Sequence, residues 1–265
     1  LSGVPPITFV VAMDREHLQE FKTVWPTWRL RPEIMGNHLM ILASDSVCPL
    51  PGGICVNPPN PAHWWLKELA FLDHPSWGLS VWPWPGIGPF ESQRENMLSA
   101  FVYAPWNIQT KWFCKLDTDC VSTGSGPWID PKWFENDPVF IASPWSYSKP
   151  SNAHQILDDW CDGVPELAKY PRLNLPFDPQ SRLVKCKRII SWQYFGRTDW
   201  HQWLAGLCGR RLPFPSHDTL TWHVAERTGA FYRKVKLKEY GWAHVRPRRL
   251  KEVARETLER QHATA

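Results

Sequence analysis

The sequence predicts an α/β fold with a mainly parallel central sheet flanked by helices, in a single domain whose second half is less regular. Three observations support this prediction. Short, continuously apolar runs alternate along the chain with longer segments that suit helices, an order typical of parallel sheets. The runs are rich in β-branched residues, as expected for strands that are buried on both faces. Acidic residues stand at the ends of three of these runs.

The predicted strands of the first half end at acidic residues. The run PITFVVAM at 6–13 leads into Asp14, and the run HLMILA at 38–43 is soon followed by Asp45. In open α/β sheets, ligands lie beyond the carboxyl ends of the strands, and core packing does not require acids there. We therefore expect a binding site at this edge. The remaining strands of this half are expected at 79–82, 111–117 and 138–142.

Helices are expected between these strands. Residues 15–31 are compatible with a helix, although Pro26 and Pro32 limit its extent. The clearest helix of the first half covers 91–104, because its apolar residues recur at helical spacing. It also contains Arg94.

The second half begins near residue 151 and is less regular. A helix at 216–228 has Ser216 as its predicted N-cap and Gly229 as its stop signal. At least one strand is expected between 231 and 245. The other predicted elements are helices near 154–162 and 199–207, a strand near 186–192 and a charged helix at 248–262.

The composition indicates an ordinary globular protein. Of 265 residues, 43% are hydrophobic and 21% are charged, which argues against disorder. The formal charge of +4 is too small to indicate a nucleic-acid partner. No apolar stretch approaches the roughly 20 residues that span a bilayer, so we expect no transmembrane segment in this sequence.

The cysteines favour a reducing compartment. The sequence has seven of them, scattered and without C-x-x-C spacing, which argues against a structural zinc site. An odd, scattered set is more typical of reduced thiols than of a disulfide framework. We therefore expect a cytoplasmic protein.

The segment KWFCKLDTDCVS at 111–122 carries a buried-looking strand into two carboxylates, Asp117 and Asp119. Side chains spaced in this way can reach one cation, and carboxylate oxygens suit Mg²⁺ or Mn²⁺. Such an ion neutralises a diphosphate leaving group. The alternative is a surface turn in which the aspartates cap their own backbone.

The segment KLDTD at 115–119, with the helix at 91–104 and the opening strand ITFVVAMD, resembles the nucleotide-sugar-dependent glycosyltransferases of the GT-A fold, which carry an Asp-x-Asp motif. The resemblance covers about residues 6–145 and, more loosely, 190–245, and identifies no subfamily. It implies a nucleotide-sugar-binding half at about 1–145, an acceptor-binding half at about 146–245 and a helical tail at 246–265.

The resemblance also implies roles for individual residues. Asp119 matches the direct metal ligand, and Asp117 matches the aspartate that contacts the ribose or the metal. Many metal-dependent members add a histidine near the C-terminus, a position that His244 matches. The nucleotide-contacting positions correspond to Ala12, Met13, Asp14, Asp45 and Arg94.

Inverting members of this fold need a carboxylate that deprotonates the acceptor hydroxyl, often at the start of a helix in the second half. Asp218 matches this position, but it is equally a first-turn helix acid stabilised by the helix dipole. The segment SWQYFGRTDWHQWL at 191–204 offers aromatic rings to an acceptor sugar or to the core. These rings belong to Trp192, Tyr194 and Trp200.

The predicted function is metal-dependent transfer of a hexose from a UDP- or GDP-sugar to a hydroxyl acceptor, with Mn²⁺ or Mg²⁺ as cofactor and with inversion through Asp218. One alternative is a retaining transferase of the same fold. A nucleotidyltransferase is disfavoured because the loop after the first strand, MDREHLQEF, has no glycine. A non-catalytic carbohydrate-binding protein is suggested by the abundance of tryptophan, 18 residues, many in proline-rich stretches.

Overall fold

The structure is a computed structural model of the chain. It describes residues 3–15, 17–43, 67–75, 78–83, 104–124, 127–149, 153–173, 175, 177–178, 183–209 and 217–263. The predicted helix at 91–104 falls almost wholly outside these ranges, as do Asp45, Arg94 and Ser216. The roles predicted for those three residues therefore concern positions outside the described residues.

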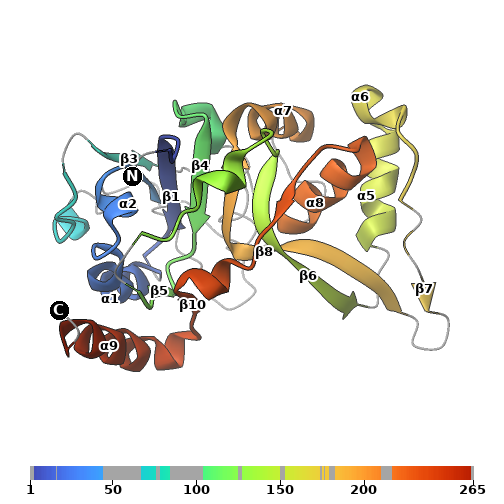
Figure 1. The fold of residues 1–265 in the computed structure, drawn as a ribbon. Helices are drawn as coiled ribbons and strands as arrows, with labels where there is room; N and C mark the ends of the chain where they lie inside the picture. Colours follow the sequence, from blue (N-terminus) through green and yellow to red (C-terminus); the bar gives the residue numbers. More distant parts are fainter. Residues whose placement is uncertain are drawn as a thin grey trace, which may run out of the picture.

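A central sheet organises the described part of the chain (Figure 1). Among its described strands, only β8 runs against the others, so the sheet is mainly parallel, as predicted. β7 (Phe177–Asp178) pairs with β8 beside this main path. The main path runs in the order β3 (Leu79–Pro83), β2 (His38–Ala43), β1 (Ile7–Met13), β4 (Trp112–Leu116), β8 (Leu183–Arg197), β6 (Phe140–Lys149) and β9 (Arg233–Lys234).

The predicted strands are confirmed, and two are longer than expected. β1 and β4 are buried along their whole length, which agrees with their continuous apolar sequences. The prediction placed a strand at 186–192, whereas β8 has 15 residues, and β6 has ten. Their polar ends hid this length, because the prediction followed only apolar runs.

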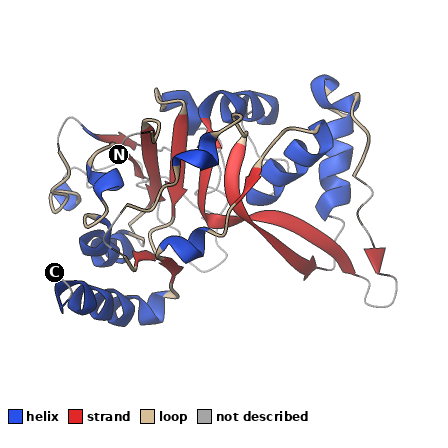
Figure 2. Cartoon of the chain, viewed as in Figure 1, coloured by secondary structure: helices blue, strands red, loops and turns tan. Residues whose placement is uncertain are grey.

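Helices cover both faces of the sheet (Figure 2). α1 (Leu18–Trp28) and α9 (Pro247–Ala263) pack on one side, where residues of both helices join a core with alternate side chains of β1 and β4. On the other side, a second core includes α5 (Ala153–Asp162), α7 (Thr198–Cys208) and α8 (His217–Thr228). α1 continues two residues past Pro26, and Pro32 starts a new helix, α2 (Pro32–Met35), at its favoured first position.

Short helical turns complete the framework. One is the helix α6 (Pro165–Ala168), which follows α5. The others are the 3₁₀ helices η2 (Ala104–Asn107), η3 (Pro131–Phe134) and η4 (Leu237–Tyr240). Among the described residues, no helix has both the length and the apolar character needed to cross a membrane.

A second, two-stranded sheet joins the middle of the chain to its end. β5 (Cys120–Ser122) pairs antiparallel with β10 (Trp242–His244), next to α1 and α9 (Figure 1). The indole N–H of Trp28 on α1 donates to the carbonyl of Cys120 at 2.6 Å. This small sheet therefore pairs the C-terminal segment with the strand that immediately follows the Asp-Thr-Asp sequence.

Candidate metal and donor site

Three predicted ligands gather beside the small sheet. Asp117 and Asp119 lie in the turn between β4 and β5, which is closed by a hydrogen bond from the Cys120 amide to the Asp117 carbonyl at 3.2 Å. In the β5–β10 pair, His244 is opposite Cys120, and the Val245 amide donates to the Asp119 carbonyl at 3.1 Å. One ligand atom from each of the three side chains lies within 4.8 Å of the other two.

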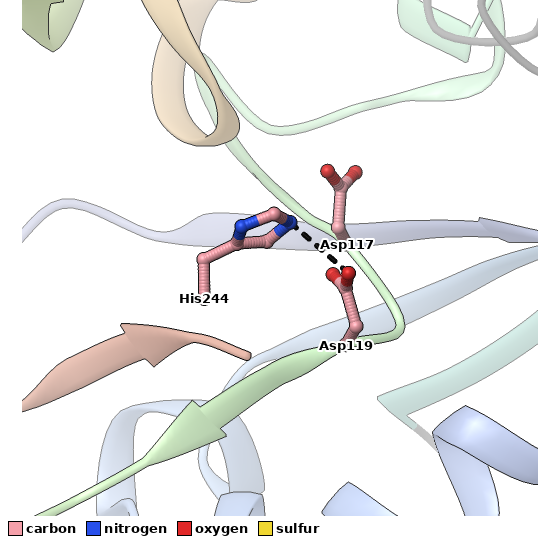
Figure 3. A group of neighbouring side chains, drawn as sticks. All are labelled: Asp117, Asp119 and His244. Atoms are coloured by element: carbon pink, nitrogen blue, oxygen red, sulfur yellow. Dashed lines mark ion pairs between the residues drawn. The ribbon is translucent and has the colours of Figure 1, made fainter. Parts of the chain in front are cut away.

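The imidazole of His244 points at the Asp119 carboxylate, with Asp117 beside them (Figure 3). Nε2 of His244 lies 3.0 Å from Oδ2 of Asp119, and the side chains are 44% and 17% exposed. The hydrogen bond to Asp119 raises the pKa of His244 above its usual value, and burial opposes this shift. The group is therefore partly open to solvent and combines two carboxylates with one imidazole.

The donor set fits a divalent cation. Oδ1 of Asp119 is buried and has no hydrogen-bond partner among the described residues. A buried carboxylate oxygen without a donor is costly, and a cation would satisfy it. Two carboxylates and one imidazole are ligands that Mn²⁺ accepts, and the carboxylates also suit Mg²⁺.

A buried lysine accompanies the first aspartate. Lys115 lies inside β4, is 2% exposed, and forms an ion pair with Oδ1 of Asp117. Asp117 is 31% exposed, so its carboxylate lies between the buried ammonium and solvent. The prediction missed this partner, although a lysine within the apolar run WFCKL was a visible signal.

Burial and the negative charges of Asp218 and Asp117 all raise the pKa of Tyr194. Tyr194 is opposite Lys115 in the β4–β8 pair, and its pKa is raised by burial first and then by the negative charges of Asp218 and Asp117. Asp218 is 2% exposed in the first turn of α8, where its Oδ1 accepts from the Thr219 amide at 2.9 Å. The ring of His217, the first residue of α8, lies 5.8 Å from that of Tyr194, so α8 begins beside the strand that pairs with β4.

The last residues of β1 and the aspartate that follows them are buried. Ala12 and Met13 are 4% and 0% exposed, so their side chains pack into the core. Asp14 is fully buried, and its Oδ1 accepts from the His17 amide at 3.0 Å and lies 2.7 Å from Nδ1 of His17. In the described residues, Asp14 thus stabilises the entry to α1.

Glu20 on α1 was also missed by sequence reasoning. Its carboxylate accepts from the Thr118 hydroxyl at 2.8 Å, which ties the middle residue of the Asp-Thr-Asp turn to α1. Burial raises the pKa of Glu20, and the charges of Asp119 and Asp14 raise it further, against the Thr118 hydrogen bond. A glutamate in an amphipathic helix gives no sequence signal for such a contact.

The predicted acceptor aromatics are corrected in part. Tyr194 and Trp200 are 1% and 8% exposed and belong to the core between the sheet, α7 and α8, so they offer no accessible face to a sugar. They are buried because β8 runs through the middle of the sheet and α7 packs on it. The side chain of Trp192 lies outside the described part of the structure.

Solved structures with similar folds are glycosyltransferases. Core-mannan synthase A from Aspergillus fumigatus, in its Mn/GDP form, has a TM-score of 0.56 at 10% identity, over 90% of this chain and 74% of that one. The mannosyltransferase Ktr4p from S. cerevisiae has a TM-score of 0.55 at 11% identity, over 92% and 71%. GlyE from Streptococcus pneumoniae TIGR4, a glycosyltransferase, gives 0.44 at 13% identity, and the chain spans 45% of its length.

Sequence comparisons give no closer relationship. No protein-family profile matches the sequence, and no curated protein matches it. The structural similarity extends over about nine-tenths of the chain. The chain therefore has the GT-A fold found in these glycosyltransferases.

Proposed function

We propose that this chain is a metal-dependent glycosyltransferase that transfers a hexose from a nucleoside-diphosphate sugar to a hydroxyl acceptor. The observation that carries the proposal is the meeting of Asp117, Asp119 and His244 at the end of β4 on a GT-A fold. The similar core-mannan synthase A was solved with Mn and GDP, and Ktr4p was also solved with GDP. These two structures favour a GDP-sugar over a UDP-sugar as donor.

Asp119 and His244 would hold Mn²⁺ or Mg²⁺, with Asp117 as a further ligand or a ribose contact. A bound cation would supply positive charge to stabilise a diphosphate leaving group. Ala12, Met13 and Asp14 would contact the nucleotide at the end of β1, chiefly through backbone atoms. Asp45 and Arg94 remain proposed donor contacts from the resemblance alone.

Asp218 is the proposed base for an inverting reaction. A carboxylate oxygen of Asp218 would accept the proton of the acceptor hydroxyl while the hydroxyl oxygen bonds to the sugar and the sugar's bond to the nucleoside diphosphate breaks. Its position supports this role, because the ring of the adjacent His217 lies 5.8 Å from that of Tyr194, which is opposite Lys115 of β4. A retaining enzyme of the same fold would not depend on this base, so the effect of substituting Asp218 distinguishes the two mechanisms.

We further propose a division into a donor half, about 1–145, and an acceptor half, about 146–245, within one catalytic domain. The four cysteines in the described residues are buried free thiols, which supports a reducing compartment such as the cytoplasm. They are Cys114, Cys120, Cys161 and Cys208.

Calorimetric titration of GDP and UDP, each with and without Mn²⁺, tests the proposal. We expect Mn²⁺-dependent binding of one nucleotide, and its loss in Asp119→Asn. The control Asp159→Asn removes a surface carboxylate that pairs with Arg172 and should keep binding. If neither nucleotide binds, or Asp119→Asn binds normally, the proposal fails. Sugar binding that persists in chelator without donor hydrolysis would instead indicate a non-catalytic carbohydrate-binding protein.

A further inference from the structure

Arg31 is a buried cation that contacts β5 and the residues just before β10. It lies between α1 and α2 and is 3% exposed. Its Nε donates to the Ser122 hydroxyl at 2.6 Å, and its Nη2 donates to the carbonyls of Gly241 at 2.7 Å and Tyr240 at 3.2 Å. Burial lowers its pKa to about 10, so the guanidinium remains charged at neutral pH.

The chain leaves room for this guanidinium at two glycines. A Cβ built on Gly124 would lie 2.7 Å from Nη2 of Arg31, and one built on Gly241 would lie 2.4 Å from it. Gly241 also has a φ of +81°, a conformation that side chains disfavour. The Trp242 ring lies 5.8 Å from the guanidinium carbon, a cation–π distance. The two glycines and the Trp242 ring therefore form a close-fitting site for the guanidinium of Arg31.

This arrangement lies at one end of a strand pair whose other end carries a proposed metal ligand. β5 and β10 have three residues each, with Trp242 opposite Ser122 and His244 opposite Cys120. Arg31 binds at the Ser122 end, and His244 faces Asp119 beyond the Cys120 end. A two-stranded sheet of this size is marginal by itself, so its register depends on contacts from outside.

We propose that Arg31 is a positioning residue for the metal site, which fastens β5 to β10 and so holds His244 against Asp119. The inference rests on the proposed function only in requiring that the site bind a divalent cation. Arginine suits this role because its planar group presents five donors in fixed directions, and here three acceptors lie around it. Lysine would keep the positive charge but would lack the planar set of donors that reaches all three acceptors.

The test measures binding of Mn²⁺ alone, by electron paramagnetic resonance of the free ion, with melting temperature as a second readout. The variants are Arg31→Met, Arg31→Lys and the milder Ser122→Ala, each in the wild-type and His244→Ala backgrounds. Arg29→Met is the control, since Arg29 is half-exposed and pairs with Asp73 at the surface. We expect Arg31→Met to weaken Mn²⁺ binding about tenfold, the scale for residues that support metal ligands, with smaller losses in the other two variants.

The double variants separate positioning from general support. If Arg31 acts through His244, its substitution has no further effect on Mn²⁺ affinity once His244 is alanine. Equal losses in both backgrounds, or unchanged affinity in all three variants, would overturn the inference. If Arg31→Met does not fold, Arg31→Lys and Ser122→Ala decide the question. Wild-type protein that binds no Mn²⁺ would overturn the proposed metal site itself, an outcome distinct from the others.

Discussion

Nε2 of His244, the last residue of β10, lies 3.0 Å from Oδ2 of Asp119, the residue that precedes β5. The pairing of two three-residue strands brings these side chains together from distant parts of the chain. Their contact completes a group of three potential ligands, because Asp117 and Asp119 alone supply only two. His244 therefore makes the clearest test of whether this group is a metal site.

Replacing His244 with alanine should weaken Mn²⁺ binding by about 10- to 100-fold and leave the melting temperature nearly unchanged. Affinity falls because an imidazole ligand is lost, and stability is kept because the side chain is 44% exposed. Calorimetric titration with Mn²⁺ and a thermal melt provide the two measurements. His262→Ala, on the exposed face of α9, is the matched control. Unchanged Mn²⁺ affinity in His244→Ala would exclude His244 as a ligand.

Asp117→Asn should lower stability as well as activity, because it removes the carboxylate that pairs with the buried ammonium of Lys115. Breaking a fully buried pair costs about 3–5 kcal/mol. Since Asp117 is 31% exposed, we expect about 2 kcal/mol and a melting temperature lower by roughly 4–8 °C. The double variant with Lys115→Met should recover stability and not activity. Equal melting temperatures for wild type and Asp117→Asn would show that the pair does not stabilise the fold.

The main sheet could be predicted because its strands carry their own signal. β1, β2 and β4 are continuous apolar runs, and burial on both faces requires that pattern. The opposite direction of β8 was not predictable, since strand direction depends on connections and packing rather than on local sequence. The extent of β6 was missed for a related reason, because its later residues SPWSYSK are not an apolar run.

The metal ligands could be predicted from the resemblance, and their supports could not. Asp119 and His244 fall in recognisable positions, so their meeting was expected. β5 and β10 have too few residues to show any periodicity, and Arg31 reads as an ordinary charged residue at the end of a helix. Its role arises from contacts with Ser122 and Gly241, which are distant in sequence. The sequence left Tyr194 open between an acceptor contact and the core, because aromatic residues suit both, and the structure places it in the core.

Asp218→Asn tests the proposed base. We expect transfer to a hydroxyl acceptor to fall at least about 100-fold, the usual contribution of general base catalysis, while Mn²⁺-dependent nucleotide binding stays within twofold. Asparagine keeps an oxygen for the hydrogen bond from the Thr219 amide, so α8 should still form. Product analysis by NMR would establish the anomeric configuration. Full transfer activity in Asp218→Asn, or a product with retained configuration, would contradict the inverting mechanism.

Buried histidines in the second half of the chain should make the protein sensitive to acid. Burial lowers the pKa of His154, His201 and His223 from the ordinary value of 6.5 to about 4 in each case. Nδ1 of His154 lies 3.0 Å from Nδ1 of His223, whose Nε2 is 3.1 Å from Asp158 between α5 and α8. Charging either ring would place a cation beside the other, and Arg227 already binds the same carboxylate at 2.9 Å.

His201 offers the simplest measurement of this effect, because it lies apart from the pair and is 4% exposed. Its folded-state pKa is below the unfolded value, so the unfolded chain binds more protons between pH 6.5 and 4. The stability that neutral His201 contributes is therefore complete above about pH 6.5 and is lost as pH falls towards 4. Linkage gives on the order of 2 kcal/mol between pH 7 and pH 5.

In urea unfolding, His201→Gln should lose less stability over that interval than wild type, while the exposed control His262→Gln should lose as much as wild type. Parallel losses in all three proteins would show that His201 is not responsible.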